Sequence, residues 1–446
     1  METKMESKAE QLSIDSLFEY EPTTVQSVET ASVSLVSNKK VPYFPKQLSF
    51  DQFSEDGWKT FDEVDLKEKF LKNMDWLKSM SVEEHTFYKK WLEIKSYSHL
   101  MSKAEEVKAK IWRPIDIFNK ETTLKELNDI KPKIKYVDPT NESDMSDWLL
   151  LRVFCHTMSY EQSPGRFIRF LVYVENDSGT VKYLGAASIS NDVMALTCRD
   201  KFIGWTSKNR IEDKTLIHSA IGSCIMGTQP FGYNFLGGKL VACLILSSHV
   251  RETWEKIVEK KLVGMTTTSL YGPNSMYCGI PYWEGCGCSA GKISIKPDDY
   301  LYDAWHDYIK QHRTAEYMKK TMKEDQDSGP VTGVKQRILE IIFREMGIPA
   351  SKYNHGFERG VYYSCFYDET KDVLTNKLTD LSNLTLKKRF QSDDVGMIEW
   401  WRKKAINRYT KLHTENRLKP EVLFYNKMID MTYDQAKNVY LTEVGR

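Results

Sequence analysis

A helical block is the first regular pattern along the chain. Apolar residues recur there at spacings of three and four, which places them on one face of a helix: Leu66, Phe70, Met74 and Leu77. Ser81, with Glu84 three residues later, forms a capping-box pattern. The helix that it begins carries its own apolar stripe, made of Phe87, Trp91 and Ile94. We therefore expect a structural helical region over residues 46–130, after a mobile tail over residues 1–45 that lacks such periodicity.

From residue 133 the pattern changes to strands that alternate with helices. Runs dense in β-branched and aromatic residues predict the strands, and runs with helical spacing predict the helices. The expected strands cover residues 134–137, 166–175, 182–190, 221–231 and 262–272. The expected helices cover residues 147–158, 235–257 and 298–310. This order predicts an α/β or α+β fold, with a mixed sheet covered by helices, over residues 131–320.

The remaining residues, 321–446, are expected to be mainly helical and locally basic. Between Lys387 and Lys419 there are ten basic side chains and four acidic ones. Apolar residues in this stretch mark one face of a helix: Trp401, Ala405, Tyr409 and Leu412. The basic side chains around the other faces are suited to binding phosphates, although an ordinary solvated helix face would have the same composition.

The overall charge excludes a protein that holds nucleic acid through a net positive charge of the whole molecule. Sixty-three Lys and Arg residues stand against sixty-two Asp and Glu residues, for a net charge of +1, so any basic surface has to be local. The eight cysteines are scattered through apolar stretches, as is typical of a reducing compartment. No stretch is long and apolar enough to predict a signal peptide or a membrane span. We therefore expect a cytoplasmic protein with no membrane partner.

The segment FLGGK, which contains Phe235, Gly237, Gly238 and Lys239, is a candidate anion site. It begins a predicted apolar helix, and the free N–H groups of a first helical turn attract phosphates that glycines allow to come close. The spacing of a Walker or a GxGxxG motif is absent. The alternative is that the glycines permit a tight turn and close helix packing.

Tyr271 and Tyr277 are candidate catalytic residues. They follow a predicted strand that is rich in hydroxyl groups and breaks at a Gly-Pro-Asn turn. Active sites favour the carboxyl end of such strands, and a phenol can donate a proton to a leaving group. The alternative is ordinary strand composition. The nearby CGCSAG run, at 286–291, lacks the spacing of a zinc site, so no metal is expected.

Two further segments mix charged residues with aromatic residues and glycine. Asp200 lies in RDKFIGW, and Arg359 lies in NHGFERGVYYS. Substrate-binding loops often have such compositions, but a structural Arg–Asp pair would have the same one. The chain shows no nucleophile elbow of a serine hydrolase.

Several strings, taken together, resemble a family of phage and prophage proteins that includes DruA of the Druantia antiphage defence systems. They are LGAASIS, RDKFIGW, FLGGKL, VRETW, TTTSLYG with SMY, HGFERGVYYS and WWRKKAINR, which follow one another between about residues 130 and 412. TTSLYG and RGVY are the most specific of them. The resemblance implies a role in phage defence or counter-defence, with nucleic acid and other defence-system or phage proteins as partners.

The order of strands and helices is also similar to the GNAT acyltransferase fold, which the DNA-modification protein Mom resembles as well. That similarity implies a splayed sheet that opens beside the diglycine helix, a coenzyme A thioester as a possible cofactor, and FLGGK at its pyrophosphate. The usual glycine signature of GNAT enzymes is replaced by FLGGK in this chain. In such enzymes a base deprotonates an amine and a tyrosine protonates the departing thiolate. The resemblance thus nominates Asp200 as the base and Tyr271 or Tyr277 as the acid.

Two functions remain open on the sequence. The first is a GNAT-like group transferase that modifies a nucleic-acid base, with DNA as the expected substrate and the base flipped out of the duplex. The second is a non-catalytic DNA-binding or assembly subunit of a defence or counter-defence system. In both, a shared set of basic side chains is expected to contact nucleic acid: Arg359, Arg402, Lys403, Lys404 and Arg408. An endonuclease is disfavoured, because no Asp, Glu and Lys cluster has the spacing of a metal site.

Overall fold

The computed structural model describes residues 63–159, 166–176, 178–270, 275–291, 295–321 and 334–444. The tail expected over residues 1–45 lies outside them. The strands are β1 (Lys133–Val137), β2 (Phe167–Glu175), β3 (Val181–Asn191), β4 (Ser219–Gly227), β5 (Gly264–Ser269), β6 (Glu284–Cys288) and β7 (Gly360–Cys365).

The α-helices of the described residues fall into three groups along the chain. Before and between the first strands lie α1 (Glu63–Ser79), α2 (Val82–Ser96), α3 (Met101–Ala109), α4 (Lys120–Asp129) and α5 (Glu142–Cys155). The middle of the chain forms α6 (Thr197–Ile203), α7 (Ser207–Ile211), α8 (Phe231–Phe235), α9 (Gly237–Leu244) and α10 (Ser248–Val258). The last group is α11 (Asp299–His312), α12 (Thr314–Thr321), α13 (Val334–Glu345), α14 (Thr370–Leu374), α15 (Asp393–Thr414) and α16 (Tyr433–Val444).

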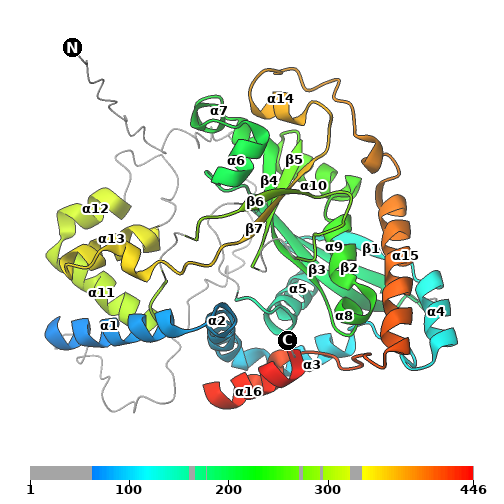
Figure 1. Cartoon of the computed structure of the whole chain (residues 1–446), viewed down its shortest axis with the longest axis horizontal. Coiled ribbons are helices and arrows are strands. Elements are labelled where there is room, and N and C mark those ends of the chain that lie inside the picture. Colours follow the sequence, from blue (N-terminus) through cyan, green and yellow to red (C-terminus); the bar gives the residue numbers. More distant parts are fainter. Residues whose placement is uncertain are drawn as a thin grey trace, which may run out of the picture.

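The seven described strands form one mixed sheet in the order β1–β2–β3–β4–β5–β7–β6 (Figure 1). Every neighbouring pair is antiparallel except β4 and β5, which are parallel. Parallel neighbours need a long crossover, and α8, α9 and α10 provide it between these two strands. The mixed α/β fold predicted from the sequence is therefore confirmed.

The parallel pair, β4 and β5, is joined only near its beginning. The register runs from Ser219 opposite Gly264 to Gly222 opposite Thr267, after which β4 continues as a partner of β3 alone. Ser223 has no partner in that register and is exposed, so it forms a bulge at the point where the two strands separate. The C-terminal half of β4 thus leads away from β5 towards the beginning of α9.

Helices cover both faces of the sheet (Figure 1). On one face, α9 and α10 pack with α15 in a core that includes Val241, Trp254 and Trp401. On the other face, α5 packs with the N-terminal helices and with α11 and α13. The indole N–H of Trp148 on α5 donates to the carbonyl oxygen of Ala187 on β3 at 2.9 Å, which fixes α5 against the sheet.

The single helix predicted over residues 235–257 is wrong, because the chain forms α8, α9 and α10 in its place. Leu236 has a left-handed φ of 55°, which separates α8 from α9. Ser247 has an extended backbone at the N-cap position of α10, without a side-chain capping bond, so the apolar run that favours one helix is interrupted at this serine. These breaks let α9 lie on β3 and β4 while α10 lies beside β1.

The sequence pattern missed two strands. β7 lies between β5 and β6 and all its residues are buried, so it lacks the alternation of a half-exposed strand. β6 contains two glycines and two cysteines and has no apolar pattern at all. The sheet thus includes a strand from beyond residue 320, where the α/β region was expected to end. The division of the chain into domains stays a prediction.

Candidate functional site

The long helix α15 is the element that carries most of the predicted nucleic-acid contacts. Its apolar face packs on the core as predicted, with Trp401, Ala405, Tyr409 and Leu412 fully buried. Two hydrogen bonds fix its rotation: the indole N–H of Trp401 donates to the carbonyl oxygen of Phe235 at 2.8 Å, and the Tyr409 hydroxyl donates to that of Ile117 at 2.9 Å. The faces of α15 that point to solvent are therefore determined by its packing.

The predicted basic residues of α15 divide into two kinds. The guanidinium of Arg402 donates to the carbonyl oxygens of Leu127 (3.1 Å) and Ile130 (2.7 Å), where α4 ends. The guanidinium of Arg408 lies 4.9 Å from the centre of the Tyr233 ring. Lys403 and Lys404, in contrast, are exposed and make no hydrogen bond or ion pair with any other described residue. Only the two lysines have charges that the fold itself does not use.

Arg359 lies away from this helix, beside the sheet. It directly precedes β7, its backbone N–H donates to Ser289 Oγ at 3.0 Å, and its carbonyl accepts the N–H of Ser289 at 2.9 Å. The residue therefore extends the pairing of β6 with β7. Its side chain is half-buried.

The two glycines of FLGGK lie where α9 approaches the end of β4. Gly237 is buried, and a Cβ atom on it would come within 2.3 Å of Phe231 Cδ1. A Cβ atom on Gly227 would come within 2.7 Å of the backbone nitrogen of Gly238. Side chains at these positions would push α9 away from α8 and β4. The geometry thus favours the packing explanation of the diglycine, and the carbonyl of Phe235 is already bonded to Trp401.

The first turn of α9 is covered by residues 275–283, a segment that we call the strap. The ammonium group of Lys239 donates to two strap carbonyls, Met276 O at 2.8 Å and Cys278 O at 2.5 Å. The indole N–H of Trp283 donates to Ala242 O at 2.8 Å. Burial lowers the pKa of Lys239 below its usual range. The residues present therefore do not fit the pyrophosphate of coenzyme A, because the chain itself takes up the cationic group that would hold it.

Tyr277, the strap residue nominated as a proton donor, is buried between the strands that separate. Its hydroxyl lies 3.1 Å from Thr267 Oγ1, which donates to the carbonyl oxygen of Gly222 on β4 at 3.2 Å. Burial raises the pKa of Tyr277 well above its usual range. The contact links β5 to the strap and to β4 next to their opening. Tyr271, the other nominated acid, lies outside the described residues.

Asp200, nominated as the base, has donors on both of its carboxylate oxygens. Oδ1 accepts from Nε and Nη2 of Arg199, at 2.9 and 2.7 Å. Oδ2 accepts from the backbone N–H of Leu196 at 3.0 Å and lies 3.1 Å from Nη1 of Arg210. A base needs a free oxygen, so proton abstraction by Asp200 would require these donors to be released.

Asp192 was missed by sequence reasoning and is the centre of a buried polar cluster. Its Oδ1 accepts from Arg199 Nη1 at 2.6 Å. Its Oδ2 accepts from the hydroxyls of Ser219 (2.6 Å) and Thr266 (2.7 Å). The Arg199 guanidinium also lies 4.9 Å from the Trp205 ring. The cluster joins α6 to the beginnings of β4 and β5, and the signal for it in the sequence is only an aspartate directly after a strand.

Metal and membrane sites are not indicated by the part of the chain that the structure describes. No three His, Cys, Asp or Glu side chains among these residues are grouped so that they could hold a metal ion. None of the helices formed by these residues has the length and apolar composition to cross a bilayer.

Removal of the Asp192 carboxylate is expected to destabilise the protein strongly. Asp192→Ala leaves the buried guanidinium of Arg199 without its main partner, which typically costs about 3–5 kcal/mol. Asp129→Ala is the matched control, because Asp129 is exposed and its side chain makes no hydrogen bond or ion pair with another described residue, so its loss typically costs about 0.5 kcal/mol or less. Urea denaturation measures both free energies of unfolding. Equal values for the two variants would show that the cluster does not hold the sheet together.

The packing explanation of the diglycine predicts different effects at its two positions. Gly237→Ala forces a methyl group into the ring of Phe231, and overpacking of this kind costs about 1–3 kcal/mol. At Gly238 the nearest atom to an added Cβ is the flexible Met276 sulfur at 3.0 Å, and alanine favours the helix by about 1 kcal/mol. Gly238→Ala should therefore change the free energy of unfolding little. A larger loss of thermal stability in Gly238→Ala than in Gly237→Ala would contradict this explanation.

The comparisons with known proteins point to one family. The chain matches the family model described as Druantia protein DruA over residues 86–376, from α2 to the residues just after α14. It is 25% identical to the Druantia protein DruA of Escherichia coli (strain UMEA 4076-1) over 278 residues, which cover 58% of this chain and 65% of that protein. No solved structure matches. The basic helix α15 lies outside the matched residues. Because the family model covers more than half of the chain, the chain belongs to the family of the Druantia protein DruA.

Proposed function

We propose that this chain is a component of a Druantia-type antiphage defence system, in the cytoplasm of a bacterial host, and that it binds nucleic acid through α15. The observation that carries the proposal is that the ammonium groups of Lys403 and Lys404 are exposed and pair with none of the described residues. Phosphate binding needs cations whose charge is not neutralised within the fold. Because the net charge of the whole chain is close to zero, nucleic acid has to be attracted by a local basic surface. DNA is the expected nucleic acid, and other proteins of the system are expected partners.

Packing supports this use of α15 in a second way. Trp401 and Tyr409 fix the helix, so the lysines are presented at a constant spacing rather than on a mobile segment. Arg402 and Arg408 contribute less, since their guanidinium groups already contact α4 and Tyr233. Arg359 is a separate candidate beside β7. The proposal thus rests on two of the five basic residues expected from the sequence.

A group transferase is the second candidate function, and the separation of β4 from β5 favours it. An opening in a mixed sheet at a single parallel pair is the kind of place where ligands bind. The bulged Ser223 is exposed there, and its hydroxyl lies 2.9 Å from that of Ser188. The strap covers the neighbouring α9, however, so coenzyme A would have to displace it. A transferase that uses Tyr277 as the acid and Asp200 as the base would also require both side chains to break their hydrogen bonds, with Thr267 and Arg199 respectively.

Charge reversal on α15 should flatten the salt dependence of DNA binding. The logarithm of affinity falls with the logarithm of salt concentration by about 0.9 for each phosphate contact, so Lys403→Glu with Lys404→Glu should reduce that slope by about 2. Fluorescence anisotropy with a labelled duplex at several salt concentrations measures it. The control is Lys201→Glu with Lys208→Glu, which changes the net charge equally at exposed positions on α6 and α7. An unaltered slope in the α15 variant would reject this surface.

Mass spectrometry of nucleosides distinguishes the two functions. Cells that express the wild-type chain should yield unmodified nucleosides if the chain only binds nucleic acid. A new nucleoside mass that disappears in the Tyr277→Phe variant would establish the transferase instead. The variant loses a hydroxyl whose recorded partner is Thr267, a contact worth about 1 kcal/mol, so its folding should be retained. Circular dichroism of the purified variant provides that control.

A further inference from the structure

Two large apolar side chains are exposed in the loop between α3 and α4. Ile115 is 86% exposed and Phe118 is 58% exposed. Burial of such side chains is the usual outcome of folding, since each removes a large apolar surface from water. Isolated exposed apolar side chains are normal, so this pair is of interest because it lies in one short loop that hydrogen-bonds to the basic helix α15.

The loop holds these side chains in a fixed place. The Tyr409 hydroxyl donates to Ile117 O at 2.9 Å, and His413 Nε2 donates to Phe118 O at 3.0 Å. Asp116 contributes at the tip, where its carboxylate accepts the N–H of Phe118 at 2.9 Å and its carbonyl accepts the Thr123 hydroxyl at 2.8 Å. The ring of Phe118 is thus presented by a backbone that α15 and α4 hold in position. A backbone that is already held loses little conformational entropy when a ligand covers the ring.

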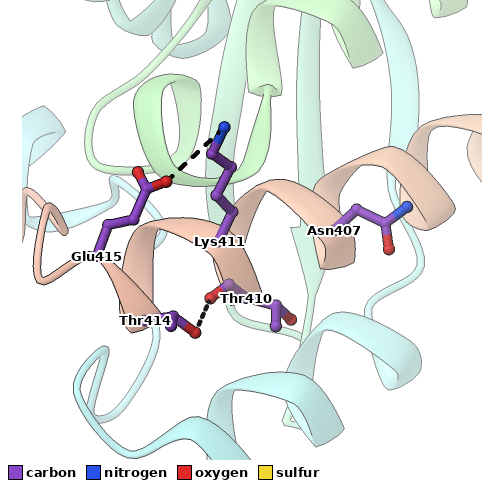
Figure 2. Close-up of a pocket in the computed structure, with 5 residues that line it drawn as sticks. All are labelled: Asn407, Thr410, Lys411, Thr414 and Glu415. Carbon is purple, nitrogen blue, oxygen red and sulfur yellow. Dashed lines mark hydrogen bonds and ion pairs between the residues drawn. The ribbon is translucent and has the colours of Figure 1, made fainter.

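The adjoining face of α15 is polar and slightly hollow. A cavity of about 330 Å³ opens to solvent there, lined by Asn407, Thr410, Lys411, Thr414 and Glu415 (Figure 2). Lys403, Asn407, Thr410 and Thr414 follow one another at spacings of four, three and four, so they share one side of the helix. His413, which holds the loop of Phe118, lies on the same last turns of α15. The loop of Phe118 and the hollow thus both lie against the last turns of α15.

The charge of this surface suits a polyanion. Within residues 113–120 and 403–415, the exposed charged side chains are five basic ones, Arg113, Lys120, Lys403, Lys404 and Lys411, and two acidic ones, Asp116 and Glu415. Glu415 lines the hollow and pairs with Lys411 at 3.7 Å, so Lys403 and Lys404 carry the charge that remains for a ligand. The carboxylate of Asp116 is already bonded to the N–H of Phe118. Arg113 and Lys120 stand on either side of the loop in the sequence, and Lys403 and Lys404 lie on α15. Cations that follow a groove, together with aromatic rings, are the common means of binding single strands.

We propose that this surface binds single-stranded nucleic acid, with an unpaired base stacked on Phe118 and phosphates beside Lys403 and Lys404. The inference rests on the proposed function and makes it more specific, because it names the strandedness of the nucleic acid. Bases inside a duplex have both faces covered by their neighbours, so an exposed ring adds affinity only for unpaired bases. Amide and hydroxyl groups in the hollow can accept the edge of the next base.

The experiment compares single and double strands on the full chain. Labelled oligo-dT, oligo-rU and a DNA duplex of equal length are titrated in fluorescence anisotropy. Phe118→Ala should weaken binding of a single strand by about 5- to 100-fold, as expected for the loss of one stacked base, and should change duplex binding less than about twofold. Phe118→Trp should retain single-strand binding, because indole stacks as well. Val395→Ala, which removes another exposed apolar side chain of α15 (62% exposed), should change neither.

The outcomes separate this inference from the proposed function. If the wild type binds single-stranded and duplex nucleic acid, and Phe118→Ala reduces both affinities equally or not at all, the stacking site is rejected. Nucleic-acid binding by the chain would still stand. If the wild type binds no nucleic acid, both fail. A selective loss for oligo-dT, oligo-rU or both supports the stacking site, and its preference identifies DNA or RNA as the ligand.

Discussion

The buried carboxylate of Asp192 is the constraint on which the sheet depends. A charge removed from water needs an opposite charge and hydrogen-bond donors around it, and Arg199, Ser219 and Thr266 supply both. Ser219 and Thr266 belong to the two strands that form the parallel pair. The cluster therefore fastens that pair at one end, while the other end separates around Ser223. The polar cluster thus lies at the joined end of the parallel pair, and the bulge at Ser223 lies where the two strands separate.

Charged side chains of α15 are also used within the fold. Arg402 completes the hydrogen bonding of α4, and Arg408 covers the ring of Tyr233, so these two cations belong to the packing of the molecule. Lys403 and Lys404 serve no such purpose. A count of basic residues in the sequence therefore overstates the number of cations that a ligand can contact. The contacts of each side chain show which cations the fold already uses. Lys239 on α9 is a further example, since its ammonium group holds the strap.

Local patterns in the sequence were read correctly where the partner groups are near in the chain. The capping box of Ser81 and Glu84 forms as expected, and the apolar spacing from Trp401 to Leu412 marks the buried face of α15. Other features depend on residues far apart. Asp192 meets Thr266 only in the folded sheet, and Arg402 meets Ile130 across most of the chain. β7 was missed because a strand buried on both faces shows no alternation. The function is the hardest feature to predict from the sequence, because such distant contacts decide which cations can bind a ligand.

The position of β7 also has a consequence for biosynthesis. β5 ends at Ser269, and its neighbour on the open side begins only at Gly360, after α11, α12 and α13. During translation the ribosome must add about ninety more residues before that edge can be paired, and closing so long a connection is slow. Until then the nascent chain displays the unpaired amides of a β-rich edge, which is a template for aggregation. A nascent chain that stalls before Gly360 is therefore expected to be prone to aggregation, however well its first strands have folded.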